Sequence, residues 1–366
     1  MSERNRGIDL FRIIAMIFAV GVHIVGQGGV LDATVKQSLT YETARILDII
    51  FVCCVDCFAL ISGYVGYGSR FKPANILYFW METLFYSVLI TVVFHFIDPG
   101  QVNGNAIITS AFPVIFRQYW YITAYFCLFF FMPAINSLIR NTSAGFALYL
   151  FAVSVILFSV LPSLAGADLF HTGRGYAPLW LAVMYGIGAA CRKYPVLDKI
   201  SKPVSLAGFF GCAALTWAVK RGIELANIGF LNKYVYHEYM VSYTAVTTVI
   251  ASILLLAFFS KIKPKRTGWI SFTCPLVLGV YLLHVHPLIF GNLFKGLFKG
   301  LASLPAPVMA LAVIFCAVAV FAVCAAADYL RLLLFNAAHI RQFCTFVERK
   351  LTGLFRRAIP SETDPE

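Results

Sequence analysis

The chain has 366 residues, of which 60% are hydrophobic and only 13% are charged. Soluble globular domains are usually about one quarter charged, so this composition excludes an ordinary soluble protein and indicates one that spans a membrane many times. The formal charge of +12 is spread over several short segments rather than gathered in one patch, so we expect no nucleic-acid partner.

Ten long apolar segments recur from end to end, each close to the ~20 residues that cross the hydrocarbon of a bilayer as a helix. Their residues are continuously apolar and do not alternate, which favours helices over a β-barrel. The sequence therefore predicts an all-α, polytopic membrane protein with about ten transmembrane helices. The segments run over residues 8–29, 43–67, 76–97, 119–139, 144–164, 177–191, 203–219, 240–260, 270–291 and 306–328.

The lysines and arginines between these segments predict the orientation of the chain. With the N-terminus in the cytoplasm, the cytoplasmic segments hold 19 of them and the opposite loops hold 8, which puts both termini inside. We expect one transmembrane domain over residues 1–330 and a cytoplasmic tail over 331–366. The basic, apolar stretch "RQFCTFVERKLTGLFRR" predicts an amphipathic helix on membrane lipid, and "PSETDPE" predicts a disordered end.

The first segment carries three ionisable residues that an oily helix does not need: Asp9, Arg12 and His23. Arg12 and His23 are eleven residues apart, almost three helical turns, so they share a face and lie roughly 16 Å apart along the axis. An ionisable group at membrane depth is a candidate for function by default. The alternatives are a histidine that only packs against a neighbouring helix, and an Asp9–Arg12 ion pair that only sets topology.

An Asp-x-x-Arg followed by ten residues and a His, here Asp9, Arg12 and His23, resembles the first helix of membrane-bound acyltransferase family 3. Other segments of the chain, in the same order, resemble later parts of that family. They are "FALISGYVGYGSRFKP" (58–73), the helix 119–139 with Trp120, Pro133 and Asn136, and "GVYLLHVHPLI" (279–289).

The resemblance implies transfer of an acyl group, usually acetyl, from cytoplasmic acetyl-CoA to a sugar hydroxyl of a cell-envelope or lipid-linked glycan. It implies a multi-pass protein of the inner (cytoplasmic) membrane. His23 would be the catalytic base or the carrier of the acyl group, and Arg12, held by Asp9, would contact the donor. Arg70 and Lys72 would bind the CoA phosphates, although Lys72 lacks the bidentate fork of an arginine.

Three aromatic residues, Trp120, Tyr121 and Tyr125, begin the fourth segment, where they form either a membrane-interface belt or a surface for a sugar ring. His284, one helical step after Tyr281, is the candidate to line the acceptor path with it.

His284 and His286 point to different helix faces, so we expect no metal site between them. The buried carboxylates Asp56 and Glu82 need partners, for which Arg12 and His23 are the candidates, and a structural pair is favoured over a catalytic one.

A membrane transporter or flippase is the alternative class, because transporters also place ionisable residues at mid-membrane. Transporters often show internal repeats and helices broken at matching positions of two halves, and neither is evident in this sequence. The leading prediction is therefore a membrane acyltransferase. The acceptor, the length of the acyl chain and the oligomeric state stay open.

Overall fold

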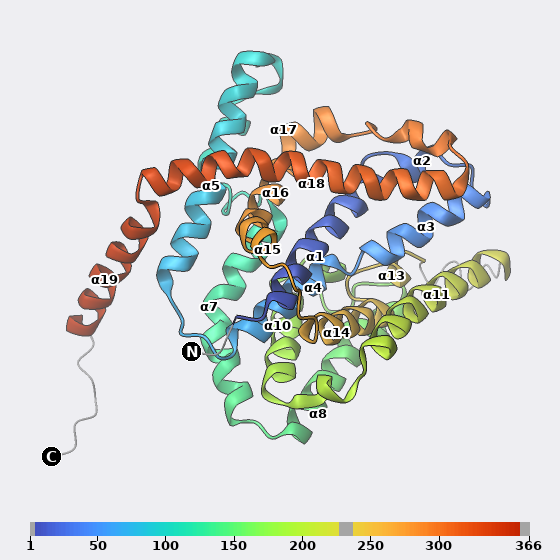
Figure 1. Ribbon diagram of the computed structural model, residues 1–366, viewed down its shortest axis with the longest axis horizontal. Coiled ribbons are helices and arrows are strands. Elements are labelled where there is room, and N and C mark those ends of the chain that lie inside the picture. The colour runs from blue at the N-terminus through green and yellow to red at the C-terminus, as the bar shows by residue number, and fades with distance from the viewer. Residues whose placement is uncertain (1–3, 227–236, 359–366) are drawn as a thin grey trace.

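The computed structural model describes residues 4–226 and 237–358, and every regular element in these ranges is helical (Figure 1). The all-α prediction is confirmed for this part of the chain. The first half contains α1 (Arg6–Val25), α2 (Val30–Ala33), α3 (Leu39–Phe51), α4 (Cys54–Gly66), α5 (Pro73–Ile97), η1 (Pro99–Gln101), α6 (Gly104–Ala111), α7 (Trp120–Asn141), α8 (Ala144–Val155), η2 (Ile156–Val160) and α9 (Leu161–Ala165). The second half contains η3 (Gly173–Gly175), α10 (Pro178–Lys193), η4 (Pro195–Lys199), α11 (Lys202–Ala226), α13 (His237–Met240), α14 (Val246–Ser260), α15 (Gly268–Thr273), η5 (Cys274–Leu276), α16 (Val277–His284), α17 (Pro287–Ile289), η6 (Phe290–Phe294), η7 (Lys299–Ser303), α18 (Ala306–Ala337) and α19 (Ile340–Ala358).

The described residues contain seven helices that are long and apolar enough to cross a membrane, or eight with one bent pair counted as a span. The protein is thus a multi-pass membrane protein. Seven of the ten predicted segments overlap these helices and an eighth overlaps the bent pair, whereas the other two overlap shorter helices. They are α10 with 16 residues and α14 with 15. The count of ten stays a prediction, because neither helix alone has the length of a full span.

The segment predicted as one span over 270–291 is broken. The helix that ends at His284 and the one that begins at Pro287 meet at an angle of 58°. Pro287 has no N–H to continue the ladder and forces His286 out of the helical region, to φ −55° and ψ 130°. The break puts His284 at the end of α16.

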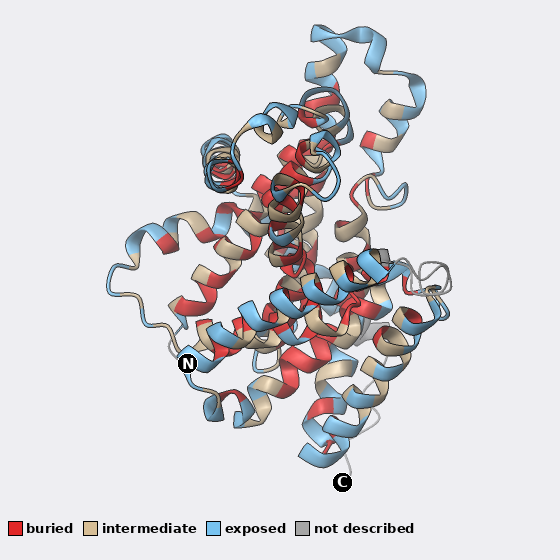
Figure 2. Ribbon diagram, turned by 90° about the vertical axis from the view of Figure 1, so that its right-hand side faces the viewer, coloured by how far each residue is buried: buried red, intermediate tan, exposed pale blue. Residues whose placement is uncertain are grey.

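Helix α1 is at the centre of the molecule and packs against α3, α4, α14, α16 and α18. In Figure 2 the buried residues gather toward the middle of the molecule and the exposed residues lie toward its outside. Helices α4 and α10 approach one another closely. A Cβ atom at Gly63 would lie 1.9 Å from the carbonyl oxygen of Tyr185, and one at Gly188 would lie 2.1 Å from that of Leu60. Glycines at this contact let the two backbones touch, as is common between membrane helices.

The end of the chain differs from the predicted tail. Helix α18 continues through the expected boundary at residue 330 to Ala337, so Arg331 is 3% exposed and belongs to the core. Helix α19 then turns away from α18 and packs against α5 (Figure 1). The end predicted as disordered, residues 360–366, lies outside the described residues.

Candidate active site

His23 and His284 form a hydrogen-bonded pair across α1 and α16, with 3.0 Å between His23 Nδ1 and His284 Nε2. On its other side, His284 Nδ1 lies 2.6 Å from the carbonyl oxygen of Val280. A carbonyl only accepts, so Nδ1 of His284 carries the hydrogen and Nε2 of neutral His284 accepts. His23 Nδ1 is then the donor, and we infer that Nε2 of a neutral His23 keeps its lone pair. This arrangement suits a base.

The two histidines differ in exposure. His284 is 2% exposed and lies behind His23, whereas His23 is only partly buried and lines a central cavity of about 450 Å³. The ring of Phe290 packs edge-on against His23 at 5.1 Å between centroids. We expected His284 on the acceptor path, and that role stays a prediction. In the structure His284 contacts His23, where it can orient the ring of His23 and select its tautomer.

The central cavity extends along α1 from Arg12 to His23. Both side chains line it because they share a helix face. Tyr121, Tyr125 and Tyr281 supply part of an aromatic wall, in which the rings of Tyr121 and Tyr125 stack at 6.0 Å. The rings of Tyr121 and Tyr125 thus border a cavity inside the protein, and their assignment to a membrane-interface belt or to a sugar-binding surface stays a prediction.

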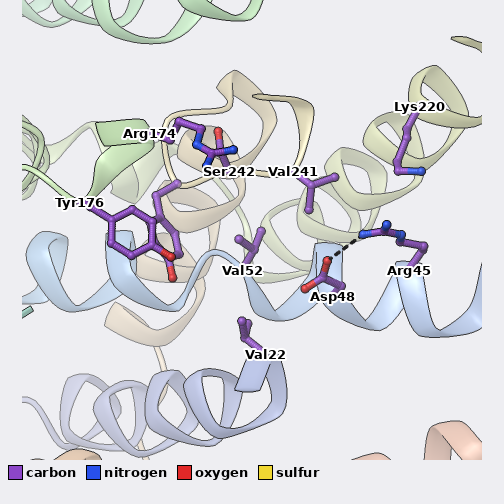
Figure 3. Close-up of a pocket in the computed structure, with 10 residues that line it drawn as sticks. Val22, Arg45, Asp48, Val52, Arg174, Tyr176, Lys220, Val241 and Ser242 are labelled. Atoms are coloured by element: carbon purple, nitrogen blue, oxygen red, sulfur yellow. Dashed lines mark ion pairs between the residues drawn. The ribbon is translucent and has the colours of Figure 1, made fainter. Parts of the chain in front are cut away.

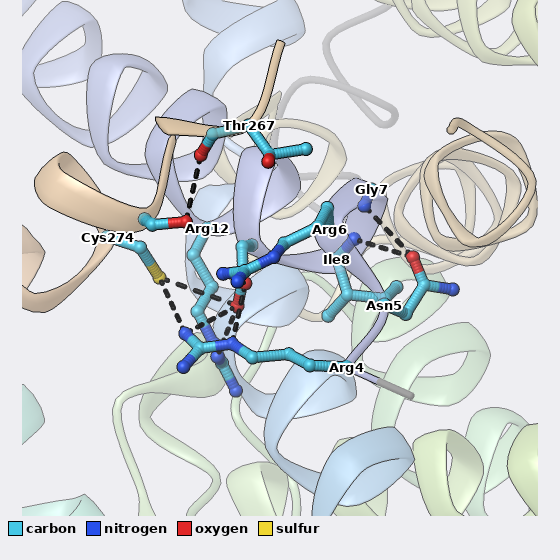
Figure 4. Close-up of polar contacts among 10 residues, drawn as sticks. Arg4, Asn5, Arg6, Gly7, Ile8, Arg12, Thr267 and Cys274 are labelled. Atoms are coloured by element: carbon cyan, nitrogen blue, oxygen red, sulfur yellow. Dashed lines mark hydrogen bonds and ion pairs between the residues drawn. The ribbon is translucent and has the colours of Figure 1, made fainter. Parts of the chain in front are cut away.

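Asp9 sits beneath this cavity and binds three arginines, although it is only 2% exposed. Its carboxylate lies 2.7 Å from Arg4, 3.3 Å from Arg6 and 3.4 Å from Arg12. Figure 4 shows these guanidinium groups converging beside Cys274, whose thiol donates to Asp9 at 3.6 Å. The hydrogen bond to Asp9 raises the pKa of Arg4. Asp9 therefore positions Arg12, and three cations around one carboxylate leave this end of the cavity positively charged.

A second space, here called the loop hollow, has a volume of about 250 Å³ and is lined by Arg70 and Lys72 at the start of α5. It adjoins the central cavity, since four residues line both: Arg12, Ser62, Phe79 and Tyr125. Asn136 also lines it and donates to the carbonyl of Gly66 at 3.2 Å. Arg12, Arg70 and Lys72, far apart in the sequence, thus face one basic space.

On the other side of His23 is a third space of about 320 Å³, here called the Arg45 hollow (Figure 3). Val22 and Tyr243 line both it and the central cavity. Arg45 and Asp48 form an ion pair of 3.6 Å on its floor. Lys220, which pairs with Glu224, is at its edge. Asp48, with Ser242, provides this hollow with acceptors and donors for hydroxyl groups.

Trp120 stands between the central cavity and the Arg45 hollow. Its ring lies 4.3 Å from that of Tyr176 and 5.9 Å from that of Tyr243. The Arg45 hollow was not predicted from the sequence. A signal was present in the acid–base pair Arg45 and Asp48, at i and i+3 inside an apolar span, which is unusual at membrane depth.

The buried carboxylates have other partners than those expected. Asp56 accepts a hydrogen bond of 2.8 Å from the indole of Trp180, and Glu82 pairs with Arg331 at 3.1 Å. Neither contacts Arg12 or His23 in the structure. His286 accepts from the backbone of Leu288 at 3.2 Å, which caps the helix after the break. Among the described residues no three His, Cys, Asp or Glu side chains are grouped to hold a metal ion.

In this many-helix membrane protein, His23 thus borders a central cavity that adjoins two further spaces. The model of the acyltransferase domain of acyltransferase family 3 matches residues 5–327, so this chain belongs to that family and is a membrane acyltransferase. The resemblance seen in the sequence is confirmed, and the transporter alternative is set aside. No curated protein and no solved structure gives a significant match to the chain.

Proposed function

We propose that the protein is an O-acetyltransferase of the inner membrane. It moves an acetyl group from cytoplasmic acetyl-CoA to a hydroxyl of a cell-envelope or lipid-linked glycan. The observation that carries the proposal is that the three spaces adjoin one another beside His23. The loop hollow shares Arg12 with the central cavity, and the Arg45 hollow shares Val22, the residue next to His23, with it. A donor from one side and an acceptor from the other would meet at His23.

The orientation follows from the distribution of basic residues. With both termini in the cytoplasm, the loop hollow opens at the inner face, where acyl-CoA is available. Arg70, Lys72 and Arg12 would bind the CoA phosphates there by charge. The thioester end of the donor would extend through the central cavity along Tyr125 and Tyr121.

The acceptor would enter from the Arg45 hollow. Sugar hydroxyls need paired donors and acceptors, which Arg45 and Asp48 provide. The flat rings of Trp120 and Tyr176, 4.3 Å apart, offer apolar surface to the faces of a sugar.

In the proposed step, Nε2 of His23 takes the proton of the acceptor hydroxyl while that oxygen attacks the carbonyl carbon of the thioester. The C–O bond forms, the C–S bond breaks, and the proton held on His23 passes to the departing thiolate of CoA. His284 accepts from Nδ1 throughout and stabilises the imidazolium by orienting it. A covalent acetyl-His23 intermediate uses the same residues in two half-reactions.

The test is transfer of label from acetyl-CoA in membranes that contain either the native protein or His23→Ala, at matched expression and with glycan from the native host. Loss of the base is expected to lower labelling by about 10²–10⁴-fold. His95→Ala is the matched control, because His95 lies exposed on α5 and lines none of the three spaces, so its labelling should equal that of the native protein. If His23→Ala labels the glycan as well as the native protein does, His23 is only a packing residue and the mechanism is wrong.

A further inference from the structure

Helix α19 lies beyond the residues that match the family, yet it packs on the part of α5 that carries the loop hollow. Two contacts fix it there. Cys344 is 1% exposed and its sulfur lies 3.7 Å from that of Met81. The guanidinium of Arg341 lies over the ring of Tyr78, 4.9 Å from its centroid. The helix is thus part of the fold at the side of the molecule where the donor would enter.

Between α19 and the start of α5 is a further space of about 600 Å³, here called the basic mouth. Arg70 and Lys72 line it from the loop before α5, and Arg341 and Arg349 line it from α19. Glu348 is the carboxylate in the same lining. Four cations and one carboxylate give a net charge of +3 to a space open to solvent, which attracts a ligand with several negative charges.

Arg341 lines both the basic mouth and the central cavity. It lines the basic mouth with Arg70 and Lys72, and it lines the central cavity with Arg12 and His23. A ligand whose charged end lies in the mouth would therefore contact an arginine that also borders the cavity of His23.

We propose that α19 supplies half of the phosphate-binding site for the donor, with Arg341 and Arg349 opposite Arg70 and Lys72. The proposal rests on the proposed function and extends it to a segment outside the family match. A coenzyme A thioester carries a diphosphate and a 3′-phosphate, enough charge to engage cations from both sides at once. Single exposed ion pairs contribute little, but arginines bind phosphate bidentately, and several on one ligand act together.

An anionic lipid offers the same phosphate chemistry, and α19 exposes Phe343 and Phe346 at 51% and 56%, as a helix at a membrane surface would. We commit to the donor, because Arg341 also lines the cavity that reaches His23. The lipid is the other outcome of the test.

The test is calorimetric binding of CoA to the full-length protein in nanodiscs of neutral lipid. Arg341→Gln and Arg349→Gln should each bind CoA about tenfold more weakly than the native protein, since each loses a charge-assisted contact. Arg341→Lys should recover part of the loss. Lys350→Gln is the control, because Lys350 is the next basic residue on α19, lies over Phe346 at 5.6 Å and does not line the mouth. Its affinity should stay within about twofold of the native value.

The outcomes separate the two proposals. If the native protein binds CoA and both arginine variants bind it with the same affinity, α19 has no role in donor binding. The acetyltransferase proposal is then unaffected. If the variants then lose only the stabilisation that anionic lipid gives to thermal unfolding, the mouth is a lipid site. If the native protein itself does not bind CoA, the proposed function fails, and the role of α19 fails with it.

Discussion

Two clusters of buried polar side chains in this protein differ in how completely their members are paired. The first is the pair His23 and His284 between α1 and α16. The second joins α18 to α5, where Asp328 is 0% exposed and accepts from Arg331 at 2.6 and 2.9 Å. Tyr86 also donates to Asp328, at 2.7 Å. Both clusters lie on membrane-spanning helices, where burying polar or ionisable side chains costs free energy.

The difference lies in what remains unpaired. Arg331 also contacts Glu82 at 3.1 Å and the hydroxyl of Tyr78 at 3.0 Å, so its charge is met on several sides by protein. Asp328 and Arg331 line none of the four spaces described above. His23, in contrast, has one ring nitrogen engaged by His284 and borders a cavity. A polar cluster closed on itself stabilises packing, whereas one with a free position beside a cavity can do chemistry.

Arg331→Met should produce the largest effect on stability. It removes the cation between two buried carboxylates, Asp328 and Glu82, and leaves both without a counter-charge. Breaking a buried pair in this way costs about 3–5 kcal/mol of unfolding free energy. The measurement is unfolding of the purified protein in mixed micelles by SDS. Arg266→Met, at an exposed loop position, is the control and should unfold like the native protein. A native-like Arg331→Met would show that the cluster is not structural.

His284→Leu should have the next largest effect, on catalysis rather than folding. Without its acceptor, Nδ1 of His23 can lose the hydrogen and Nε2 can gain it, which leaves the wrong nitrogen basic. The turnover number should fall about 10–100-fold, equivalent to about 1.4–2.7 kcal/mol of activation free energy, with KM nearly unchanged.

His284→Gln separates orientation from packing, because its amide oxygen can accept from His23. We expect it to recover part of the turnover lost in His284→Leu. If both variants retain native turnover, His284 does not position the base. If both lose it equally together with their folded fraction, the histidine only fills space.

The part of the site on one helix was predictable from sequence. Arg12 and His23 line one cavity because eleven residues bring two side chains to the same face of any α-helix. Arg70 and Lys72 face a basic hollow because they follow a span directly and precede the next one, at Pro73. These predictions needed only periodicity and the order of the segments.

The partners across helices were not predictable in the same way. His284 meets His23 over a separation of 261 residues, which depends on how α16 packs against α1 and where Pro287 ends it. Asp56 contacts Trp180 and Glu82 contacts Arg331, and neither contacts Arg12 or His23. These partners could not be predicted, because apolar patterns do not show which helices are neighbours. The charge of Arg331 predicts a position in the tail. Composition alone does not show that Arg331 has buried acidic partners, Asp328 and Glu82, or that α18 continues past residue 330.

Glu82→Gln should have the smallest effect and is the finest test of the closed cluster. Replacing Glu82 by glutamine leaves Asp328 and Arg331 as a balanced ion pair. Glutamine keeps the volume, and Arg331 keeps its two contacts to Asp328 and one to Tyr78. We expect the unfolding free energy to change by less than about 1 kcal/mol in the same SDS titration. A loss as large as that of Arg331→Met would mean that Glu82, and not Asp328, is the counter-charge on which α18 depends. The ion pair of Glu82 with Arg331 would then hold α5 to α18, rather than the hydrogen bonds of Tyr86 with Asp328 and of Arg331 with Tyr78.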